Sequence, residues 1–423
     1  MLHMVIREHP DDFLRIAANK ADGAGLPELI VREFRDPRLF FLTASAGFVL
    51  LLLLLLLLAA PATSSAQEPA QEASQTELPG RAGLERRQTL PPPTPIPPAF
   101  SVSGALRGGV QWIVNPPRAK DDVFGFGAFD LVLVGRPTPN VTLLADVETI
   151  VGPGPDAALG SLSLLNAETE RLFGDDTKVF LREAWIRLQS GDASIRFNVG
   201  KLDVTHYFDR NFFAEDETRQ FLNAALAGNP LLGQPRNGPG TSLRISQGAW
   251  RYAFGVHAPG DVDDDLSGLP YFIAELGRRH IFPLSGHYRW WARVGSVPER
   301  RDDVTWGTGI SIDQLVAADT GVFVRAGLSR SEGESLTSHA WSAGVQHTPS
   351  WLGRAKDLAG VGYSFQRQPE GREQVAEAYY NVSLADCCSI IANVQWILSG
   401  PNQVSGRRNR DVVVPGLRAL ILF

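Results

Sequence analysis

Residues 304–312 read VTWGTGISI and residues 321–329 read GVFVRAGLS, and these two stretches decide the class of fold. In the first, valine, tryptophan, threonine and isoleucine fill one set of alternate positions, while threonine, glycine and serine fill the other. Successive side chains of a β-strand point to opposite faces of its sheet. The alternation therefore predicts strands with one apolar face and one face that is small, polar or arginine-bearing.

The same two-residue alternation recurs from Ala99 to the end of the chain, in segments of about ten residues that are typical of membrane-spanning strands. We predict sixteen strands, at residues 99–114, 123–136, 140–151, 178–189, 193–200, 241–247, 250–257, 270–276, 285–296, 303–312, 320–329, 338–347, 359–366, 375–384, 389–398 and 411–423.

Short and long connections alternate between these strands. An even-stranded barrel with both termini on one side of a membrane has tight turns on that side and long loops on the other. Closure of the sheet also gives every backbone donor and acceptor a partner. The predicted fold is therefore all-β, a 16-stranded antiparallel transmembrane β-barrel with its long loops toward the cell exterior. The predicted tight turns are 136–139, 190–192, 247–249 and 385–388, and the predicted long loops are 152–177, 201–240 and 399–410.

The last predicted strand carries Leu417, Ala419, Ile421 and Phe423 at alternate positions. A C-terminal aromatic residue after such a run resembles the assembly signal of bacterial outer-membrane barrels. We therefore expect the outer membrane as the location, with its lipids and the barrel-assembly machinery as partners.

The N-terminal part of the chain is predicted to be a targeting sequence followed by a linker. The apolar run 39–60 follows three arginines and precedes Ser64-Ser65-Ala66, so residues 1–66 are predicted to be a signal peptide cleaved between Ala66 and Gln67. The run is long for a signal peptide, which leaves an uncleaved anchor as the alternative. Residues 1–30 are unlike a signal peptide and indicate a later start, such as the codon of Val31. The proline-rich stretch 67–98 is predicted to be a disordered periplasmic linker, and 99–423 the barrel.

Composition excludes several classes of function. There are 40 basic and 46 acidic residues, a net charge of −6, which argues against a nucleic-acid partner. The two cysteines, Cys387 and Cys388, are adjacent and form neither a disulfide framework nor a tetrahedral zinc site. We expect two small side chains in a turn, with a strained vicinal disulfide as the alternative. Nothing in the sequence implies a cofactor or a metal.

Two long loops are predicted to fold into the barrel and narrow it from opposite sides, because the filter of a wide barrel is normally an inserted loop. Residues 214–227, AEDETRQFLNAALA, are predicted to form a short helix, and residues 163–173, SLLNAETERLF, are predicted to form a similar one. The alternative is that both loops cover the exterior rim.

Six motifs stand out in the predicted barrel: GKLD at 200–203, YFDRNFFAEDETRQFLN at 207–223, EAYY at 377–380, NVQWI at 393–397, GPN at 400–402 and VVPGLR at 413–418. Together they resemble the carbohydrate-selective porins (OprB-type) of Gram-negative outer membranes, which are sixteen-stranded channels for glucose and related sugars. The departures from that family are the proline-rich extension, the Cys-Cys turn and Ile391-Ala392.

Sugar passage needs weak contacts from planar donors, carboxylates and aromatic faces that point into the lumen. The strand phase and the loop motif supply such side chains, and opposed arginines and carboxylates would set up a transverse field. For any one arginine, the alternative is an internal ion pair that braces the wall. The predicted constriction and sugar-contacting residues are Glu183, Trp185, Arg187, Arg196, Lys201, Asp203, Asp209, Asn211, Glu215, Arg219, Arg289 and Arg325.

His206 is a candidate catalytic base, with Asp203 and Asp209 as the acids that would orient it. No serine in a nucleophile context lies nearby and the HExxH motif is missing, so we predict a channel and expect His206 to be hydrogen-bonded to a neighbour. Trp290, Trp291, Trp306 and Trp396 are predicted to lie at the membrane interface.

Three functions remain open at this point. The resemblance implies passive, carbohydrate-selective diffusion of mono- or small oligosaccharides into the periplasm, by a monomer or a homotrimer. The alternatives are a general diffusion porin with the same barrel and a non-conducting barrel that anchors the envelope.

Overall fold

The computed structural model describes residues 100–114, 122–172, 177–258, 269–297, 300–332, 336–349, 354 and 356–423. The predicted signal peptide, its cleavage site at Ala66 and Gln67, and the linker 67–98 lie outside the described residues. Within the described part of the chain, no helix is long and apolar enough to cross a membrane.

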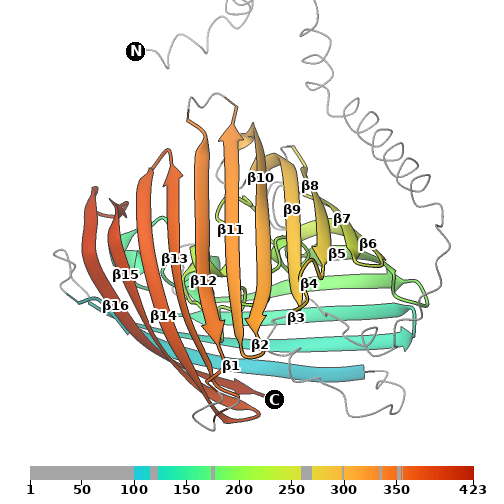
Figure 1. Ribbon diagram of the computed structural model, residues 1–423, viewed down its shortest axis with the longest axis horizontal. Helices are drawn as coiled ribbons and strands as arrows, with labels where there is room; N and C mark the ends of the chain where they lie inside the picture. Colours follow the sequence, from blue (N-terminus) through green and yellow to red (C-terminus); the bar gives the residue numbers. More distant parts are fainter. Residues whose placement is uncertain are drawn as a thin grey trace, which may run out of the picture. The chain divides into compact units, whose positions relative to one another are not determined.

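The described residues form a closed antiparallel barrel of sixteen strands, in which every strand pairs with its neighbours in sequence and β1 pairs with β16 (Figure 1). All the predicted strands are present, so the predicted fold is confirmed. The strands are β1 Phe100–Trp112, β2 Val123–Thr138, β3 Val141–Val151, β4 Thr177–Gln189, β5 Ile195–Leu202, β6 Gly238–Gln247, β7 Trp250–His257, β8 Tyr271–Arg279, β9 Gly286–Val297, β10 Arg300–Ala317, β11 Thr320–Ser331, β12 Ser338–His347, β13 Leu358–Gln368, β14 Gly371–Ala385, β15 Cys388–Asn402 and β16 Arg407–Leu422.

The two-residue alternation divides the barrel wall into an outer and an inner face. On β10, Trp306 is 46% exposed, whereas Thr305 and Ser311 are almost completely buried. The exposed positions of the other strands are also largely apolar. Such an apolar outer face suits contact with lipid acyl chains, and the polar inner face suits a wet lumen.

Phe423 closes the barrel at the end of the chain. Its carbonyl accepts the Gly104 N–H at 2.9 Å, and its own N–H donates to the Gly104 carbonyl. Its ring is 60% exposed and stacks on Phe129, with the ring centroids 6.0 Å apart. Both ends of the described barrel therefore lie at the edge that carries the β2–β3 and β14–β15 turns, which we call the turn edge.

One predicted long loop is wrong. Residues 399–410 are mostly strand, because β15 continues to Asn402 and β16 begins at Arg407, which leaves a turn of 403–406. The Gly-Pro-Asn and arginine-rich sequence of this stretch lacks the apolar alternation, but the ladder between the two strands continues through Ser399–Arg410 and Asn402–Arg407. Strand pairing therefore extends beyond the apolar band.

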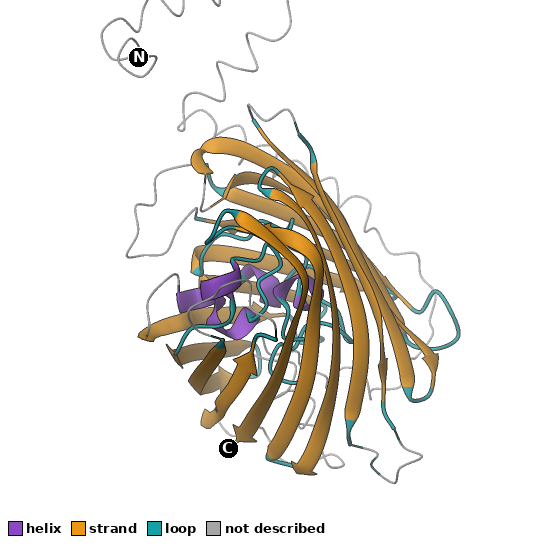
Figure 2. Cartoon of the chain, turned by 90° about the vertical axis from the view of Figure 1, so that its left-hand side faces the viewer, coloured by secondary structure: helices purple, strands orange, loops and turns teal. Residues whose placement is uncertain are grey.

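The other two long connections, 152–176 between β3 and β4 and 203–237 between β5 and β6, fold into the barrel. We call them the second loop and the third loop. Figure 2 shows the helical segments enclosed by the ring of strands. These segments are short: α6 Asp156–Leu159, η1 Ala167–Leu172, η2 Val204–His206 and α7 Ala224–Ala227.

The predicted helix at 214–227 is therefore wrong except for its last turn. Side-chain acceptors take the amides that a helix would use: Gln220 Oε1 accepts the N–H groups of Glu215 and Asp216. Glu377 on β14 accepts those of Leu222 and Asn223. The predicted helix in 163–173 is realised only as the 3-10 turn η1.

Candidate functional site

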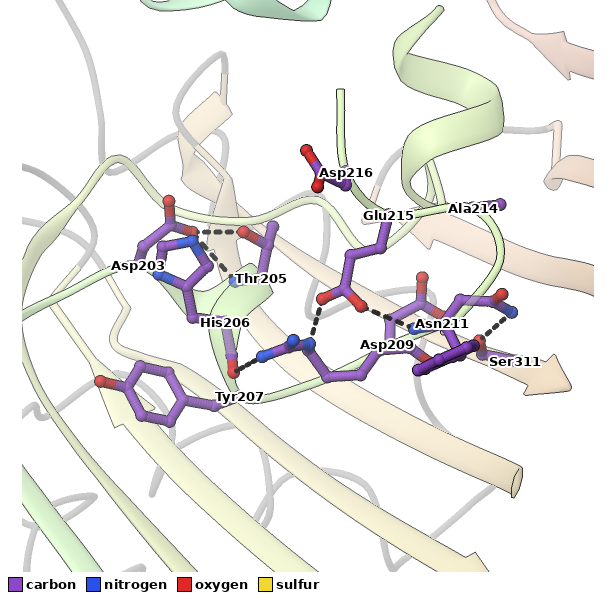
Figure 3. A network of polar contacts seen from close by, with 12 residues as sticks. Asp203, Thr205, His206, Tyr207, Asp209, Asn211, Ala214, Glu215, Asp216 and Ser311 are labelled. Atoms are coloured by element: carbon purple, nitrogen blue, oxygen red, sulfur yellow. Dashed lines mark hydrogen bonds and ion pairs between the residues drawn. The ribbon is translucent and has the colours of Figure 1, made fainter. Parts of the chain in front are cut away.

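The third loop crosses the lumen, and its first turn is fixed to β4. Asp203 caps this turn by accepting the N–H of Thr205 at 3.0 Å (Figure 3). Asp203 also pairs with Arg182 at 3.1 Å, and its own N–H donates to Glu183. His206 lies 2.8 Å from Glu183 through Nδ1 and 3.1 Å from Arg182 through Nε2.

A β-bulge explains why two consecutive residues of β4 reach the loop. Asp146 on β3 pairs with Glu183 and Val147 pairs with Leu181, so Arg182 is left over as the extra residue. Both Arg182 and Glu183 are buried. A bulge redirects side chains in this way. Strict alternation predicts Glu183 as inward-facing but misses Arg182.

Three residues hold the middle of the third loop, and we call them the anchor: Asp209, Trp291 and Arg325. The Asp209 carboxylate lies 2.9 Å from Arg325 Nε and accepts the Trp291 indole N–H at 2.8 Å. Arg325 also donates to three backbone carbonyls of the third loop, those of Asp209, Ala214 and Leu226. All three side chains are at least 95% buried.

Asn211 continues the attachment toward β10. Its amide donates to Ser311 Oγ at 3.2 Å (Figure 3). It also donates to the Ile312 carbonyl at 3.0 Å. The neighbouring Arg210 and Glu215 pair with each other and are less buried. The Glu215 carboxylate also accepts the Asn211 N–H at 3.0 Å.

Apolar packing supplements these polar contacts. Phe221 of the third loop packs against Phe323 and Tyr379 of the wall, with ring centroids 5.5 Å and 4.9 Å apart. Phe213 covers Gly321, where a Cβ atom would overlap the ring. Burying one such aromatic side chain contributes roughly 1.5–3 kcal/mol. Some of the small residues on the inner face of the strands therefore leave room for aromatic side chains of the loop.

The second loop meets the third loop inside the barrel. The Ala167 N–H donates to the Leu222 carbonyl at 2.9 Å, and the Ala224 N–H donates to the Leu164 carbonyl at 2.9 Å. Glu373 on β14 accepts the N–H groups of Leu162 and Ser163 of the second loop. Both loops therefore fold inward, as predicted, and they are joined to each other.

Acidic and basic side chains are unevenly distributed over the inner wall. Arg107 on β1 is surrounded by Asp130, Glu148 and Glu168, at 3.1–3.2 Å. Toward the turn edge, Arg196 on β5 stands directly opposite Arg244 on β6. The wall at β1–β3 is thus richer in carboxylates, and the wall at β4–β7 is richer in arginines.

Five residues on β4–β7 and the third loop form a second feature, which we call the patch: Trp185, Arg187, Tyr207, Arg244 and Arg251. Arg187 lies over the Trp185 ring, 4.8 Å from its centroid, and Arg251 reaches the Tyr207 carbonyl. Trp185 Nε1 and Tyr207 Oη are buried, and neither has a hydrogen-bond partner within the described part of the chain.

Burial sets the ionisation of the loop residues. It raises the pKa of Asp209 to about 6, although Arg325 and the Trp291 N–H favour the charged form. Burial also raises the pKa of Glu215, opposed mainly by Arg210. Burial alone would lower the pKa of His206, but Asp203 and Glu183 outweigh it, so that pKa is raised.

The structure brings some of the predicted site residues together and separates others. Glu183 meets Asp203, Asp209 meets Arg325, and Asn211 meets Glu215. By contrast, Arg289 pairs with Asp313 on β10 at 2.7 Å, and the Arg219 carbonyl accepts from Asn381 on β14. Many of these side chains are nearly completely buried, and those of Asp209, Asn211 and Arg325 hold the loop in place.

Two residues lie differently from the prediction. Lys201 stands opposite Ala184, which shares the outward face of Ala145, so the register places Lys201 on the outer side of the wall. Trp291 is completely buried and donates to Asp209, whereas Trp290, Trp306 and Trp396 are exposed. Trp291 shares the two-residue phase of Arg289 and Arg293, and that signal indicated an inward position.

The sequence prediction missed Arg107, Asp130 and Asp146, which are buried on the inner wall. The two-residue alternation of β1, β2 and β3 indicated that these side chains face inward. His206 is hydrogen-bonded to its neighbours as expected, and among the described residues no group of three or more His, Cys, Asp or Glu is placed to hold a metal ion.

Known proteins resemble this chain in sequence and fold. Residues 280–423 match the family model described as carbohydrate-selective porin, OprB family. An uncharacterized protein of Aquifex aeolicus is 28% identical over 220 residues, which span 52% of this chain and 63% of that protein. The match therefore covers less than two thirds of that relative.

Solved porin structures share the barrel. The high-pH structure of Pseudomonas putida OprB has a TM-score of 0.63 and 14% identity, covering 77% of this chain and 94% of that one. Its low-pH structure has a TM-score of 0.52 and 13% identity, covering 77% and 93%. At these identities the likeness concerns the fold. Together with the match of residues 280–423 to the family model, it points to a porin-like barrel.

Proposed function

We propose that this outer-membrane porin passes mono- or small oligosaccharides by passive diffusion into the periplasm and selects them at the patch. The observation that carries the proposal is the pair of buried polar atoms Trp185 Nε1 and Tyr207 Oη, which have no hydrogen-bond partner among the residues that the structure describes and lie beside Arg187 and Arg251. The match of residues 280–423 to the carbohydrate-selective family supports the same class of solute.

Sugars present hydroxyl groups at their edges and C–H groups on the faces of their rings. An aromatic ring takes such a face, and a guanidinium group donates to neighbouring hydroxyls in a planar arrangement. Trp185 and Arg187 offer both, and Tyr207 adds a hydroxyl that donates or accepts. Buried polar groups normally have partners, so an incoming hydroxyl that satisfies Tyr207 Oη would be favoured over an apolar group.

Passage also requires that contacts be weak enough to release the solute. The arginine-rich wall at β4–β7 faces a lumen whose β1–β3 side holds Asp130, Glu148 and Glu168. Separated charges of this kind create a transverse field that orders water and favours polar neutral solutes. Uncharged carbohydrates are therefore the proposed solutes.

Swelling of liposomes that contain the purified protein tests the proposal. Swelling that saturates with sugar concentration and is inhibited by a competing sugar is the expected result. Swelling graded only by solute size would make the protein a general diffusion porin, and no swelling or ion current would make it a non-conducting envelope anchor.

A substitution within the arginine-rich wall tests the selectivity separately. We expect Arg196→Ala to lower sugar flux more than small-ion conductance, because Arg196 and Arg244 stand together on the inner face. Arg330→Ala is a matched control, since Arg330 is an exposed residue of β11. Equal loss of sugar flux and ion conductance in Arg196→Ala would remove the claim of selectivity.

A further inference from the structure

The β14–β15 hairpin carries the only two cysteines of the chain, side by side. Asp386 and Cys387 form the turn, Cys388 begins β15 opposite Ala385, and the two cysteines are not joined in a disulfide. The two Sγ atoms lie 3.0 Å apart. Cys387 is exposed and Cys388 is partly exposed, so a solute at the turn edge can reach both sulfurs.

From this geometry we propose that Cys387 and Cys388 are a redox-active pair that closes reversibly into a vicinal disulfide by exchange with an external disulfide. The sulfurs already face each other, so closure requires only local adjustment. The inference is separate from sugar transport, but it rests on the proposed orientation that puts the turn edge in the periplasm, an oxidising compartment.

The exchange balances with a small-molecule disulfide such as oxidised glutathione. One cysteine thiolate attacks a sulfur of the external disulfide and releases one glutathione thiol. The neighbouring thiolate then attacks the protein sulfur of the mixed disulfide and releases the second glutathione. The two cysteines lose two electrons and two protons, and glutathione disulfide gains them as two thiols.

Formation of the disulfide would affect the end of the ladder between β15 and β16, because the ring formed by the disulfide includes the peptide bond between the two cysteines. The carbonyl of that peptide bond, on Cys387, accepts the N–H of Leu422 in β16 at 2.8 Å. A disulfide between neighbours distorts its peptide, and strained or exposed disulfides are the easily reduced ones. Oxidation should therefore weaken this hydrogen bond at the end of the ladder between β15 and β16, and it should reverse under mild reduction.

The full-length protein in detergent provides a direct test. Trypsin cuts after Arg372 and Arg407, and neither Lys nor Arg lies between them, so one peptide carries both cysteines. After treatment with oxidised glutathione and trapping with N-ethylmaleimide, we expect this peptide to be lighter by two hydrogens and to carry no adduct. Reduced glutathione should restore two maleimide adducts.

Cys387→Ser and Cys388→Ser are matched controls. Each retains one thiol, so each should stop at a single glutathione adduct. The proposal is overturned if the unaltered protein keeps two reactive thiols, ends with two glutathione adducts, or forms covalent dimers on non-reducing gels. None of these readouts uses conductance, so their failure is distinguishable from failure of the sugar channel.

Amide hydrogen exchange tests the effect on the ladder between β15 and β16. In the oxidised protein, exchange at Leu422 should be faster than in the reduced protein, while exchange at Leu420, opposite Ser389, should change less. Equal exchange at Leu422 in both states would overturn the coupling to the last strand.

Discussion

The anchor and the patch each include one residue of the third loop, Asp209 and Tyr207, only two positions apart, but they are built differently. At the anchor, the polar groups are paired: Asp209 holds Arg325 and accepts from Trp291. At the patch, Trp185 Nε1 and Tyr207 Oη are buried without hydrogen-bond partners among the described residues. Paired groups stabilise the loop, whereas buried polar groups without a partner cost stability.

The largest expected effect comes from removing the anchor with Arg325→Met. Removing one member of a buried ion pair costs about 3–5 kcal/mol, because the other charge stays buried. The loop would also lose three carbonyl contacts. We expect a lower unfolding temperature by heat-modified gel mobility, a higher single-channel conductance and loss of saturation by sugar. Arg330→Met is the control, and unchanged saturation by sugar in Arg325→Met would remove the anchor's role.

The second prediction concerns pH and Asp209. Its pKa of about 6 lies above its ordinary value of 3.8, so the folded protein binds this proton more tightly than the unfolded chain. Protonation of Asp209 therefore adds about 3 kcal/mol to the free energy of unfolding below pH 3.8, and this stabilisation is lost as the pH rises through about 6. Asp209→Asn removes this titration, so its stability relative to the unaltered protein should change between these pH values and stay constant outside them.

Denaturant unfolding across a pH series, followed by tryptophan fluorescence, measures this difference. Asp192→Asn is the control, because hydrogen bonds, first that from the Ser190 hydroxyl, lower the pKa of Asp192 to about 2. Its relative stability should stay constant over the same range. A parallel pH dependence in Asp209→Asn and the unaltered protein would show that other groups dominate.

The third prediction sets one tryptophan of the anchor against one of the patch. Trp291→Phe removes a donor from the buried Asp209 carboxylate and should cost about 1–3 kcal/mol beyond the lost packing. Trp185→Phe loses comparable ring area but no hydrogen bond within the described part of the chain. Unfolding free energies in one lipid mixture compare the two variants. Equal losses would mean that the anchor and the patch do not differ as argued.

The barrel was predictable because the membrane imposes one rule on every strand. A lipid-facing side chain must be apolar and every backbone group must be paired, so alternation along β10 and β11 is enough to find the wall. The same rule failed at its limits. Alternation is present only within the apolar band, so it missed the ends of β15 and β16 between Ser399 and Arg410. It also could not predict the bulge at Arg182.

The interior of the lumen was less predictable because distant residues decide it. The helical pattern at 214–227 is local, but Glu377, more than 150 residues away, takes the amides of Leu222 and Asn223. Asp209 and Arg325 were both foreseen as facing the lumen, whereas their pairing depends on how the third loop crosses the barrel. Sequence patterns give the phase of a strand, and the partners come from the path of the loop.

The smallest effect on stability, and the most direct test of the patch, comes from Tyr207→Phe. The substitution removes a hydroxyl that lacks a hydrogen-bond partner in the described structure, so stability should stay within about 0.5 kcal/mol. If a sugar hydroxyl binds there in passage, its loss costs about 0.5–1.5 kcal/mol, a roughly two- to tenfold weaker block of ion current by sugar. Tyr252→Phe, on the neighbouring wall, is the control. A large loss of stability with unchanged block by sugar would mean that Tyr207 Oη belongs with the groups that hold the loop, and the distinction between anchor and patch would fail.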